Sequence, residues 1–199
     1  MLYKKRKLII MDLPKRKQIR LKDYDYSQNG AYFVTVCAQN REMLFGDIDD
    51  VKHIAVGADD PVRPSVKLSE IGNIIENCWN EINNIYNNIC TDKYCIMPDH
   101  FHGIIIIKDT DTGGQDQDIN GNQDTGGQGR PPLHKIVQGF KSVTTRLCFP
   151  YGYRKIWQRS YYEHIIRNQT EYEEIWQYID KNPIKWELYK YLGAERSGN

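Results

Sequence analysis

Cys95-Ile-Met-Pro-Asp-His-Phe-His-Gly-Ile-Ile-Ile-Ile107 is the stretch that decides how this chain folds. Four consecutive isoleucines are not typical of an exposed loop, and β-branched residues favour a pleated strand. A near-continuous apolar run predicts a strand that is covered on both faces. Alternate side chains of a strand point the same way, so His100 and His102 should project from one face. Two imidazoles placed in this way can hold one metal ion.

On spacing alone, two other interpretations of these histidines stay open. In the first, one imidazole is a hydrogen-bonded core residue and the other lies on the surface. In the second, Cys90 and Cys95 join the two histidines in a structural zinc site, although the spacing fits no standard zinc finger. The five cysteines are an odd number without a Cys-x-x-Cys motif, which argues against a disulfide framework.

The segments on either side of this stretch predict the other elements of the fold. Residues 31–37 are aromatic and β-branched and predict a strand, and residues 40–66 predict a variable loop with room for a short hairpin. A 3.6-residue apolar stripe predicts a long helix over 68–89. Strands over 89–97 and from residue 100 should meet at Pro98-Asp99, in a hairpin or a sharp bend.

Further along, residues 133–147 predict a second helix that ends before Pro150. Residues 155–162 predict a final strand, and a last helix should run through 171–182, capped by Asn168 or Thr170 and stopped by Pro183. This order predicts an α+β fold, a ferredoxin-like split βαβ antiparallel sheet with helices on one face plus a C-terminal helix.

Length, charge and low-complexity sequence set the organisation of the chain. The 199 residues suit one domain, with a basic N-terminal arm (1–30) and a flexible low-complexity insertion (110–129). Residues 1–22 contain nine Lys/Arg and one acidic residue, and residues 130–167 contain eight Lys/Arg and one acidic residue. Such segregation is typical of a surface that binds a polyanion, although a solvated basic tail is the alternative for the first segment. No stretch approaches a membrane span, so we expect a soluble intracellular protein without membrane partners.

Two motifs together resemble a known family. Pro98-Asp99-His100-Phe101-His102 resembles the His-hydrophobic-His signature of HUH endonucleases, in particular the single-tyrosine transposases of bacterial insertion sequences. Trp157-Gln-Arg-Ser-Tyr-Tyr-Glu-His164-Ile-Ile-Arg-Asn168, followed by Tyr178-Ile-Asp-Lys-Asn182-Pro183, resembles the REP-associated tyrosine transposases more closely. The resemblance covers residues 15–50 and 68–190, without the low-complexity insertion.

The resemblance implies a metal-dependent transposase that cleaves and rejoins single-stranded DNA at hairpins or repeats. Tyr178, on the C-terminal helix, would be the nucleophile that forms a 5′-phosphotyrosine. His100 and His102 would bind Mg²⁺ or Mn²⁺, with Asn182 at the position where related enzymes have a Gln ligand. Asp99 is either an orienter of an imidazole or a turn residue, and His164 is open between metal, DNA and structure.

The expected partner is single-stranded or hairpin DNA, with a homodimer as an alternative to a monomer, in the bacterial cytoplasm at the nucleoid. Tyr151, Tyr153, Tyr161 and Tyr162 are available for base stacking, although packing is favoured for the last two. A domesticated protein that binds hairpins without cleaving them is the main alternative function. The candidate DNA-binding residues are basic and come from both basic segments: Lys15, Arg16, Lys17, Arg20, Lys141, Arg146, Arg154, Lys155, Arg159 and Arg167.

Overall fold

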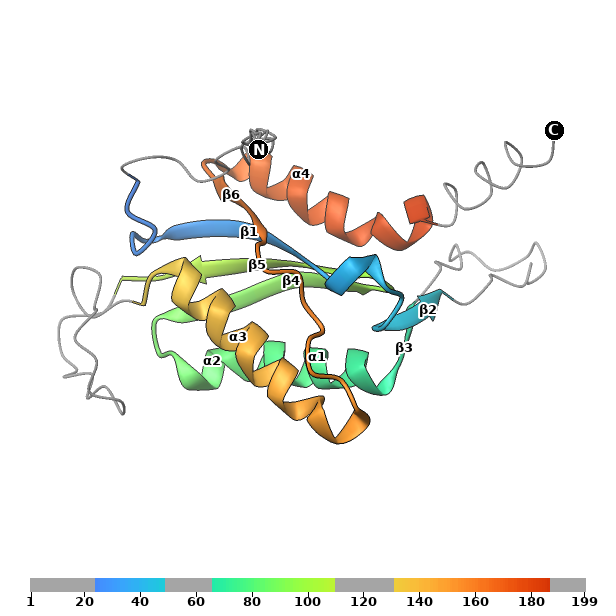
Figure 1. Cartoon of the computed structure of the whole chain (residues 1–199). Helices are drawn as coiled ribbons and strands as arrows, with labels where there is room; N and C mark the ends of the chain where they lie inside the picture. The colour runs from blue at the N-terminus through green and yellow to red at the C-terminus, as the bar shows by residue number, and fades with distance from the viewer. Residues whose placement is uncertain (1–23, 49–65, 110–130, 187–199) are drawn as a thin grey trace, which may run out of the picture.

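The computed structural model describes residues 24–48, 66–109 and 131–186. Most of the predicted basic arm and the predicted low-complexity insertion lie outside these residues. The described residues form one antiparallel four-stranded sheet with helices on both of its faces (Figure 1). The predicted α+β class with an antiparallel sheet is therefore confirmed.

The strands of the main sheet are β1 (Gly30–Cys37), β4 (Ile89–Met97), β5 (His100–Ile107) and β6 (Tyr162–Ile166), in the spatial order β4-β5-β1-β6. Each neighbouring pair is antiparallel, so β1 and β4 run the same way with β5 between them. This arrangement is a split βαβ unit. The strand that carries the two histidines is thus central, and Pro98-Asp99 forms the hairpin turn before it.

The isoleucine run of β5 is covered on both faces, as the sequence predicts. Ile105 and Ile107 belong to the larger hydrophobic cluster, whereas Ile104 belongs to a smaller cluster on the opposite face. Side chains of a strand alternate between faces, so a strand buried on both sides needs apolar residues at successive positions.

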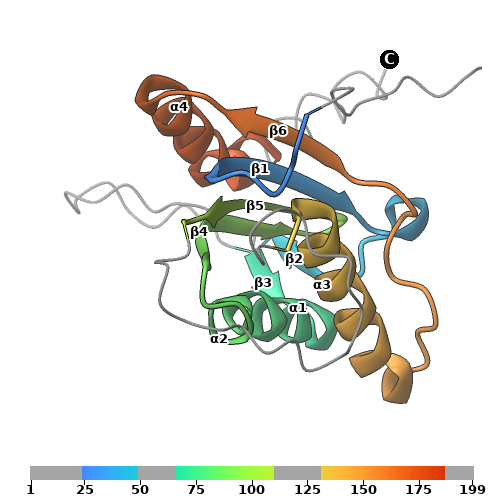
Figure 2. The same ribbon diagram turned by 90° about the vertical axis from the view of Figure 1, so that its left-hand side faces the viewer.

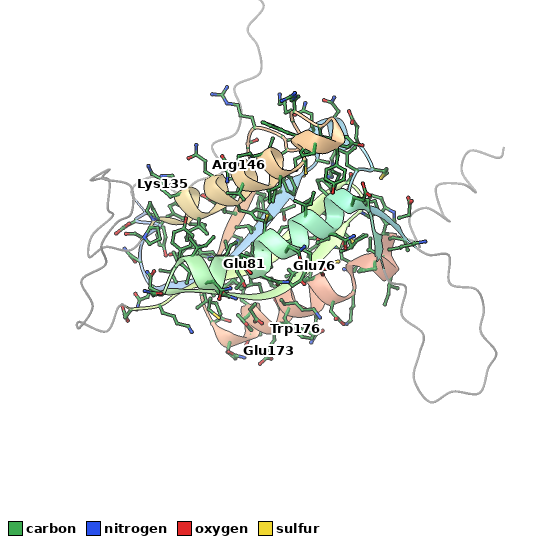
Figure 3. The ribbon with its side chains drawn as sticks, turned by 90° about the horizontal axis from the view of Figure 1, so that it is seen from below. Glu76, Glu81, Lys135, Arg146, Glu173 and Trp176 are labelled. Atoms are coloured by element: carbon green, nitrogen blue, oxygen red, sulfur yellow. The ribbon has the colours of Figure 1, made fainter. Side chains whose placement is uncertain are left out.

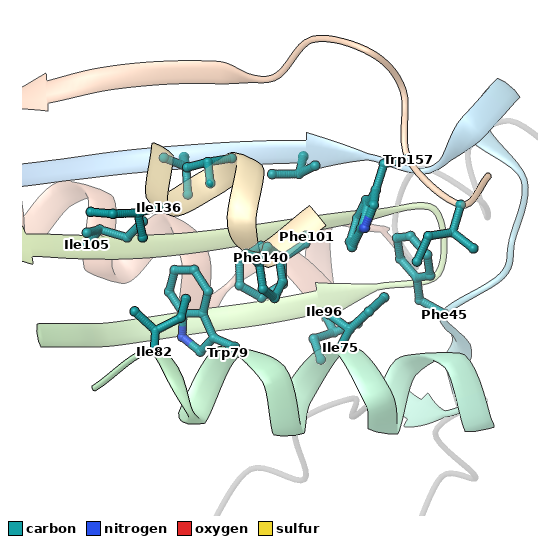
Figure 4. Close-up of a cluster of buried hydrophobic side chains, with 14 of the residues drawn as sticks. Phe45, Ile75, Trp79, Ile82, Ile96, Phe101, Ile105, Ile136, Phe140 and Trp157 are labelled. Carbon is teal, nitrogen blue, oxygen red and sulfur yellow. The ribbon is translucent and has the colours of Figure 1, made fainter. Parts of the chain in front are cut away.

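Helices α1 (Glu70–Asn80), α2 (Ile82–Ile85) and α3 (Leu133–Leu147) cover one face of the sheet, and α4 (Gln169–Asp180) covers the other (Figures 1 and 2). The larger cluster fills the space between the sheet, α1 and α3 (Figure 4). At its centre the rings of Trp79 and Phe101 lie 4.6 Å apart, and that of Phe140 lies 5.4 Å from Phe101. The smaller cluster of Phe33, Ile104, Ile166 and Ile179 lies beneath α4.

A second, small sheet forms in the segment predicted to be a variable loop. Strand β2 (Gly46–Ile48) pairs with β3 (Val66–Leu68), and residues 49–65 between them lie outside the described part. The long helix predicted over 68–89 is therefore too long at both ends, and it is divided into α1 and α2 after Asn80. Ser69 ends β3 and caps α1, because its hydroxyl accepts from the Gly72 amide at 3.1 Å.

Two further boundaries differ from prediction. Residues 155–161 are mostly irregular, with a single bridge between Trp157 and Ala38, and the last strand begins only at Tyr162. Pro183 does not stop the last helix: α4 ends at Asp180, and residues 182–186 form a new helical turn. Proline is tolerated in the first turn of a helix, where its missing N–H has no intrahelical partner. Asn168 is the N-cap of α4, accepting from the Glu171 amide at 2.9 Å.

Candidate metal and nucleophile site

His100 and His102 project from the same face of β5 and point at one another. Their Nε2 atoms lie 3.0 Å apart, and both side chains are almost fully buried. Bonds of about 2.1 Å that meet at the right angle of an octahedral ion would place two imidazole nitrogens about 3 Å apart. The interpretation in which one histidine lies on the surface is therefore wrong.

Each imidazole is held by a hydrogen bond at its other nitrogen. Thr35, directly opposite His102 in β1, places Oγ1 2.8 Å from its Nδ1, and Asp99 places Oδ1 2.5 Å from Nδ1 of His100. A carboxylate only accepts, so His100 carries its proton on Nδ1 and presents a lone pair at Nε2. His102 then donates from Nε2 to His100 and accepts from Thr35. Partners of this kind are the ones that orient metal-binding histidines.

Burial keeps both imidazoles neutral. It lowers the pKa of His100, against the opposing effect of Asp99, and lowers the pKa of His102 to about 3. Neutral imidazole is the form that binds a metal, so the pair fits a divalent ion. No cluster of three or more His, Cys, Asp or Glu side chains suited to a metal occurs within residues 24–48, 66–109 and 131–186. The zinc site with Cys90 and Cys95 is therefore wrong.

Tyr178 lies on α4 above this pair. Its ring centroid is 5.3 Å from that of His102 and 6.0 Å from that of Phe33, in edge-on contacts, and 40% of the residue is exposed. The buried Asn182 lies close enough to His100 for its side chain to raise the pKa of that imidazole, against the larger lowering by burial. In the following turn, the Nζ atom of Lys185 lies 5.1 Å from the Tyr178 ring centroid. The structure thus brings together the four residues that the sequence analysis assigned to catalysis and metal binding.

Polar contacts with β4 fix the position of α4. A bulge between Thr91 and Tyr94 interrupts the β4–β5 pairing, and the two residues inside it both contact α4. Asp92 accepts from the Tyr172 hydroxyl, and Lys93 pairs with Asp180 at 2.6 Å. The Lys93 ammonium also lies 4.0 Å from the centroid of the Trp176 ring. These contacts supplement the small apolar cluster beneath α4.

A basic pocket opens on the α3 side of the molecule. It has a volume of ≈ 630 Å³ between α3 and residues 154–161. Figure 3 shows α3, with Lys135 and Arg146 labelled, on the side of the molecule away from α4, where Glu173 and Trp176 are labelled. The pocket lining combines cations with aromatic rings, and includes Lys141, Arg146, Arg154, Lys155, Arg159, Phe149, Trp157 and Tyr161.

The candidate DNA-binding residues therefore divide into groups. Four exposed cations, Arg146, Arg154, Lys155 and Arg159, line the basic pocket. Lys141 also lines it, but its ammonium donates to the Gln158 and Arg159 carbonyls at 2.8 and 3.0 Å, so it ties the 154–161 segment to α3. Arg167 lies apart from the pocket, exposed before α4. Lys15, Arg16, Lys17 and Arg20 lie outside the described residues.

His164 has a structural contact. Its Nε2 lies 2.6 Å from Glu171 Oε1, and the other oxygen of that carboxylate accepts from the Arg167 amide. The Arg167 backbone bond, followed by the His164 side-chain bond, lowers the pKa of Glu171. His164 therefore joins β6 to the first turn of α4. Among the tyrosines considered for stacking, Tyr151, Tyr153 and Tyr162 are exposed and Tyr161 packs partly against the core.

Sequence reasoning missed two residues beside the histidines. Thr35 is 67 residues from His102, and only the register of β1 on β5 brings them together. Arg41 lies in the 3₁₀ turn η1 (Gln39–Arg41), and its Nε is 3.4 Å from Asp99 Oδ2. No local pattern marks either residue. Asp99, left open as orienter or turn residue, is both.

Comparisons with known proteins agree with this architecture. A solved REP-associated tyrosine transposase, described as bound to a REP hairpin, aligns with a TM-score of 0.51 and 18% identity, over 83% of this chain and 73% of that one. A Deinococcus radiodurans structure aligns more weakly, at a TM-score of 0.40 and 15% identity over 81% of this chain and 95% of the other. No protein-family model matches the chain.

The α+β fold of this chain is thus similar to that of a REP-associated tyrosine transposase, so the resemblance seen in the sequence is confirmed at the level of the fold. A Haemophilus influenzae protein described only as uncharacterized is 35% identical over 180 residues, 86% of this chain and 90% of its own length. The chain belongs to one family with that protein. No helix in the described part of the chain is long and apolar enough to cross a membrane.

Proposed function

We propose that this protein is a metal-dependent transposase that cleaves and rejoins single-stranded DNA at hairpins or repeats. The observation that carries the proposal is the convergence of the His100 and His102 Nε2 atoms next to the Tyr178 ring. A purely structural histidine pair has no need of oriented, neutral imidazoles facing a half-exposed tyrosine. A fold shared with a hairpin-bound transposase supports the substrate class.

His100 and His102 would hold the divalent ion, Mg²⁺ or Mn²⁺, with Asn182 as the candidate third ligand. When bound, such an ion supplies positive charge that stabilises the charge developing on a phosphate under attack. Asp99 and Thr35 keep the two imidazoles in the orientation that this binding requires.

Tyr178 is the nucleophile in this proposal. Its Oη forms a bond to phosphorus as the bond from phosphorus to the 3′ oxygen breaks. The phenol proton is released, the leaving oxygen takes up a proton, and the products are a 5′-phosphotyrosine and a free 3′-OH. Reversal of the same step by a 3′-OH rejoins strands, so neither ATP nor a second nucleophile is required.

The exposed cations of the basic pocket would hold DNA phosphates, with help from Arg167 and from the N-terminal Lys15, Arg16, Lys17 and Arg20. The aromatic rings in and near the pocket suit unpaired bases. We do not assign Lys141 to this surface, because its ammonium is used within the protein. The protein would act on DNA in the bacterial cytoplasm.

The test looks for a covalent adduct between the protein and DNA. The protein is incubated with Mn²⁺ and a radiolabelled DNA hairpin that carries single-stranded flanks, and the products are separated under denaturing conditions. We expect an adduct that disappears in Tyr178→Phe and falls at least a hundredfold in His102→Ala. Tyr162→Phe is the matched control, because Tyr162 is similarly exposed, at 45% against 40% for Tyr178, and should keep the adduct.

An adduct that persists in Tyr178→Phe would exclude this tyrosine as nucleophile. Tight hairpin binding without any adduct at any metal concentration would instead favour the domesticated hairpin-binding protein. Mixing Tyr178→Phe with His102→Ala tests whether the tyrosine acts in trans within a homodimer, because activity is restored only if one subunit's tyrosine serves its partner's histidines.

A further inference from the structure

A strained turn lies at the edge of the histidine pair. Asn40 and Arg41 have φ angles of 54° and 59°, in the left-handed region that non-glycine residues rarely adopt. Backbone bonds from both sides hold the turn. The Ala38 amide donates to the Asp99 carbonyl at 2.8 Å, and the Gln39 amide donates to the Ile156 carbonyl at 2.8 Å. Strain of this kind persists where the surroundings impose it, and it is concentrated at functional sites.

The turn directs the Arg41 side chain to the site. Its Nε lies 3.4 Å from Asp99 Oδ2, and its Nη1 donates to Cys37 Sγ at 3.2 Å. Asp99 is almost fully buried and holds His100 with its other oxygen, whereas 53% of the Arg41 side chain is exposed. A guanidinium has five N–H donors in a planar fork, so donors remain for a ligand.

The same turn lies between the basic pocket and the histidines. The Gln158 amide donates to the Cys37 carbonyl, and Trp157 bridges to Ala38, so the segment that lines the pocket runs along the end of β1. Cys37 is directly opposite His100 in the β1–β5 register. A single DNA strand that ran from the basic pocket to the histidine pair would therefore pass Arg41.

We propose that Arg41 binds a backbone phosphate of the DNA strand that enters the histidine site. The inference rests on the proposed function and adds a phosphate contact at a residue that no local sequence pattern marks. The alternative is that Arg41 only balances the charge of Asp99. The Arg41 side chain is 53% exposed, so water screens its pair with Asp99, and that pair does not by itself account for a turn with two consecutive residues at positive φ.

The experiment measures the salt dependence of DNA binding by the full chain without metal, so that no cleavage occurs. Fluorescence anisotropy follows binding of a DNA hairpin with single-stranded flanks at several KCl concentrations. Each phosphate contact to a single strand contributes about 0.7 to the slope of log affinity against log salt. We expect Arg41→Gln to reduce the slope by about 0.7 and the affinity severalfold. Arg41→Lys should keep the slope, because the charge remains. Lys67→Gln, which removes an exposed charge on β3, is the matched control and should change neither quantity.

An unchanged slope in Arg41→Gln overturns the inference, as does an equal reduction in Lys67→Gln, which would indicate a general effect of net charge. Arg41→Lys covers the case in which Arg41→Gln fails to fold, because loss of slope in a folded Arg41→Lys also contradicts a charge contact. The two proposals can fail separately. If the unaltered protein forms no covalent adduct with DNA, the proposed cleavage is excluded. If it forms the adduct but Arg41→Gln leaves the salt slope unchanged, only the Arg41 contact is excluded.

Discussion

Replacing Thr35 with valine tests whether the hydrogen bond to His102 serves metal binding. In the metal-free protein, His102 donates from Nε2 to His100 and accepts from Thr35 at Nδ1. Binding of one ion by both Nε2 atoms requires the His102 proton to move to Nδ1. The Thr35 hydroxyl can then turn from donor to acceptor, because a hydroxyl does both. Valine has a similar shape and can do neither.

The expected loss follows from burial. His102 is only 4% exposed, so an Nδ1–H without an acceptor has no water to replace Thr35. A buried donor without a partner costs about 1–3 kcal/mol, which corresponds to roughly five- to 150-fold in affinity. In metal-free Thr35→Val, the group left without a partner is the Nδ1 lone pair of His102 rather than an N–H, and an unpaired acceptor costs less free energy than an unpaired donor. We therefore expect Mn²⁺ affinity to fall by about tenfold to a hundredfold, and the unfolding free energy without metal to change by less than about 1 kcal/mol.

The assay is Mn²⁺ titration followed by the electron paramagnetic resonance signal of the free ion, together with urea unfolding in the presence of a chelator. Thr35→Ser is the control, because it keeps the hydroxyl and should bind Mn²⁺ within about threefold of the unaltered protein. Unchanged Mn²⁺ affinity in Thr35→Val would refute the proton shift described above. A large loss of metal-free stability would instead show that Thr35 supports the fold rather than the metal.

Three other predictions concern stability and motion. Gly103→Ala should lower the unfolding free energy by roughly 1–3 kcal/mol in urea denaturation, because a Cβ there would lie 2.5 Å from Trp79. Gly139→Ala is the control: it lies in a roomier helical position and should raise the unfolding free energy by about 0.5–1 kcal/mol, and equal losses in both variants would contradict this reasoning. Lys93→Met keeps the length of the side chain but removes the charge that pairs with Asp180 and lies over Trp176. Amide hydrogen exchange in α4 should therefore become about tenfold faster while exchange in β5 is unaffected, and a uniform change in both elements would count against a local role of Lys93. The pKa of Glu171 is lowered in the folded protein, so its contribution to stability is present above its ordinary pKa and is lost as the pH falls through the lowered value. Glu171→Gln should therefore flatten the acid side of a plot of stability against pH, and an unaltered acid side would argue against this contribution.

The sequence predicts the central strand and the facing histidines because both follow from local pattern. An isoleucine run and a two-residue spacing need no knowledge of distant residues. The predicted position of the last strand is wrong. Ile156 and Trp157 are apolar and indicate a strand, but they are buried because irregular chain packs on the core. The actual strand contains Glu163 and His164, whose polarity hides it.

The rest of the site depends on information that is not local. Tyr178 is one of fourteen tyrosines, and only a family resemblance distinguished it before the fold brought it to His102. Thr35 depends on strand register, and Arg41 depends on a backbone conformation that its residue type disfavours. Physical reasoning on one sequence cannot assign either before the strands are paired.

The bulge in β4 also has a consequence for how the protein behaves at high concentration. Strand β4 is an edge of the main sheet, and an unpaired edge is a template on which another chain can add a strand. Between Thr91 and Tyr94 the bulge breaks the regular ladder, and it places the charges of Asp92 and Lys93 there. Both features oppose strand addition. The residues that hold α4 in place should therefore also protect the protein from aggregation through this edge.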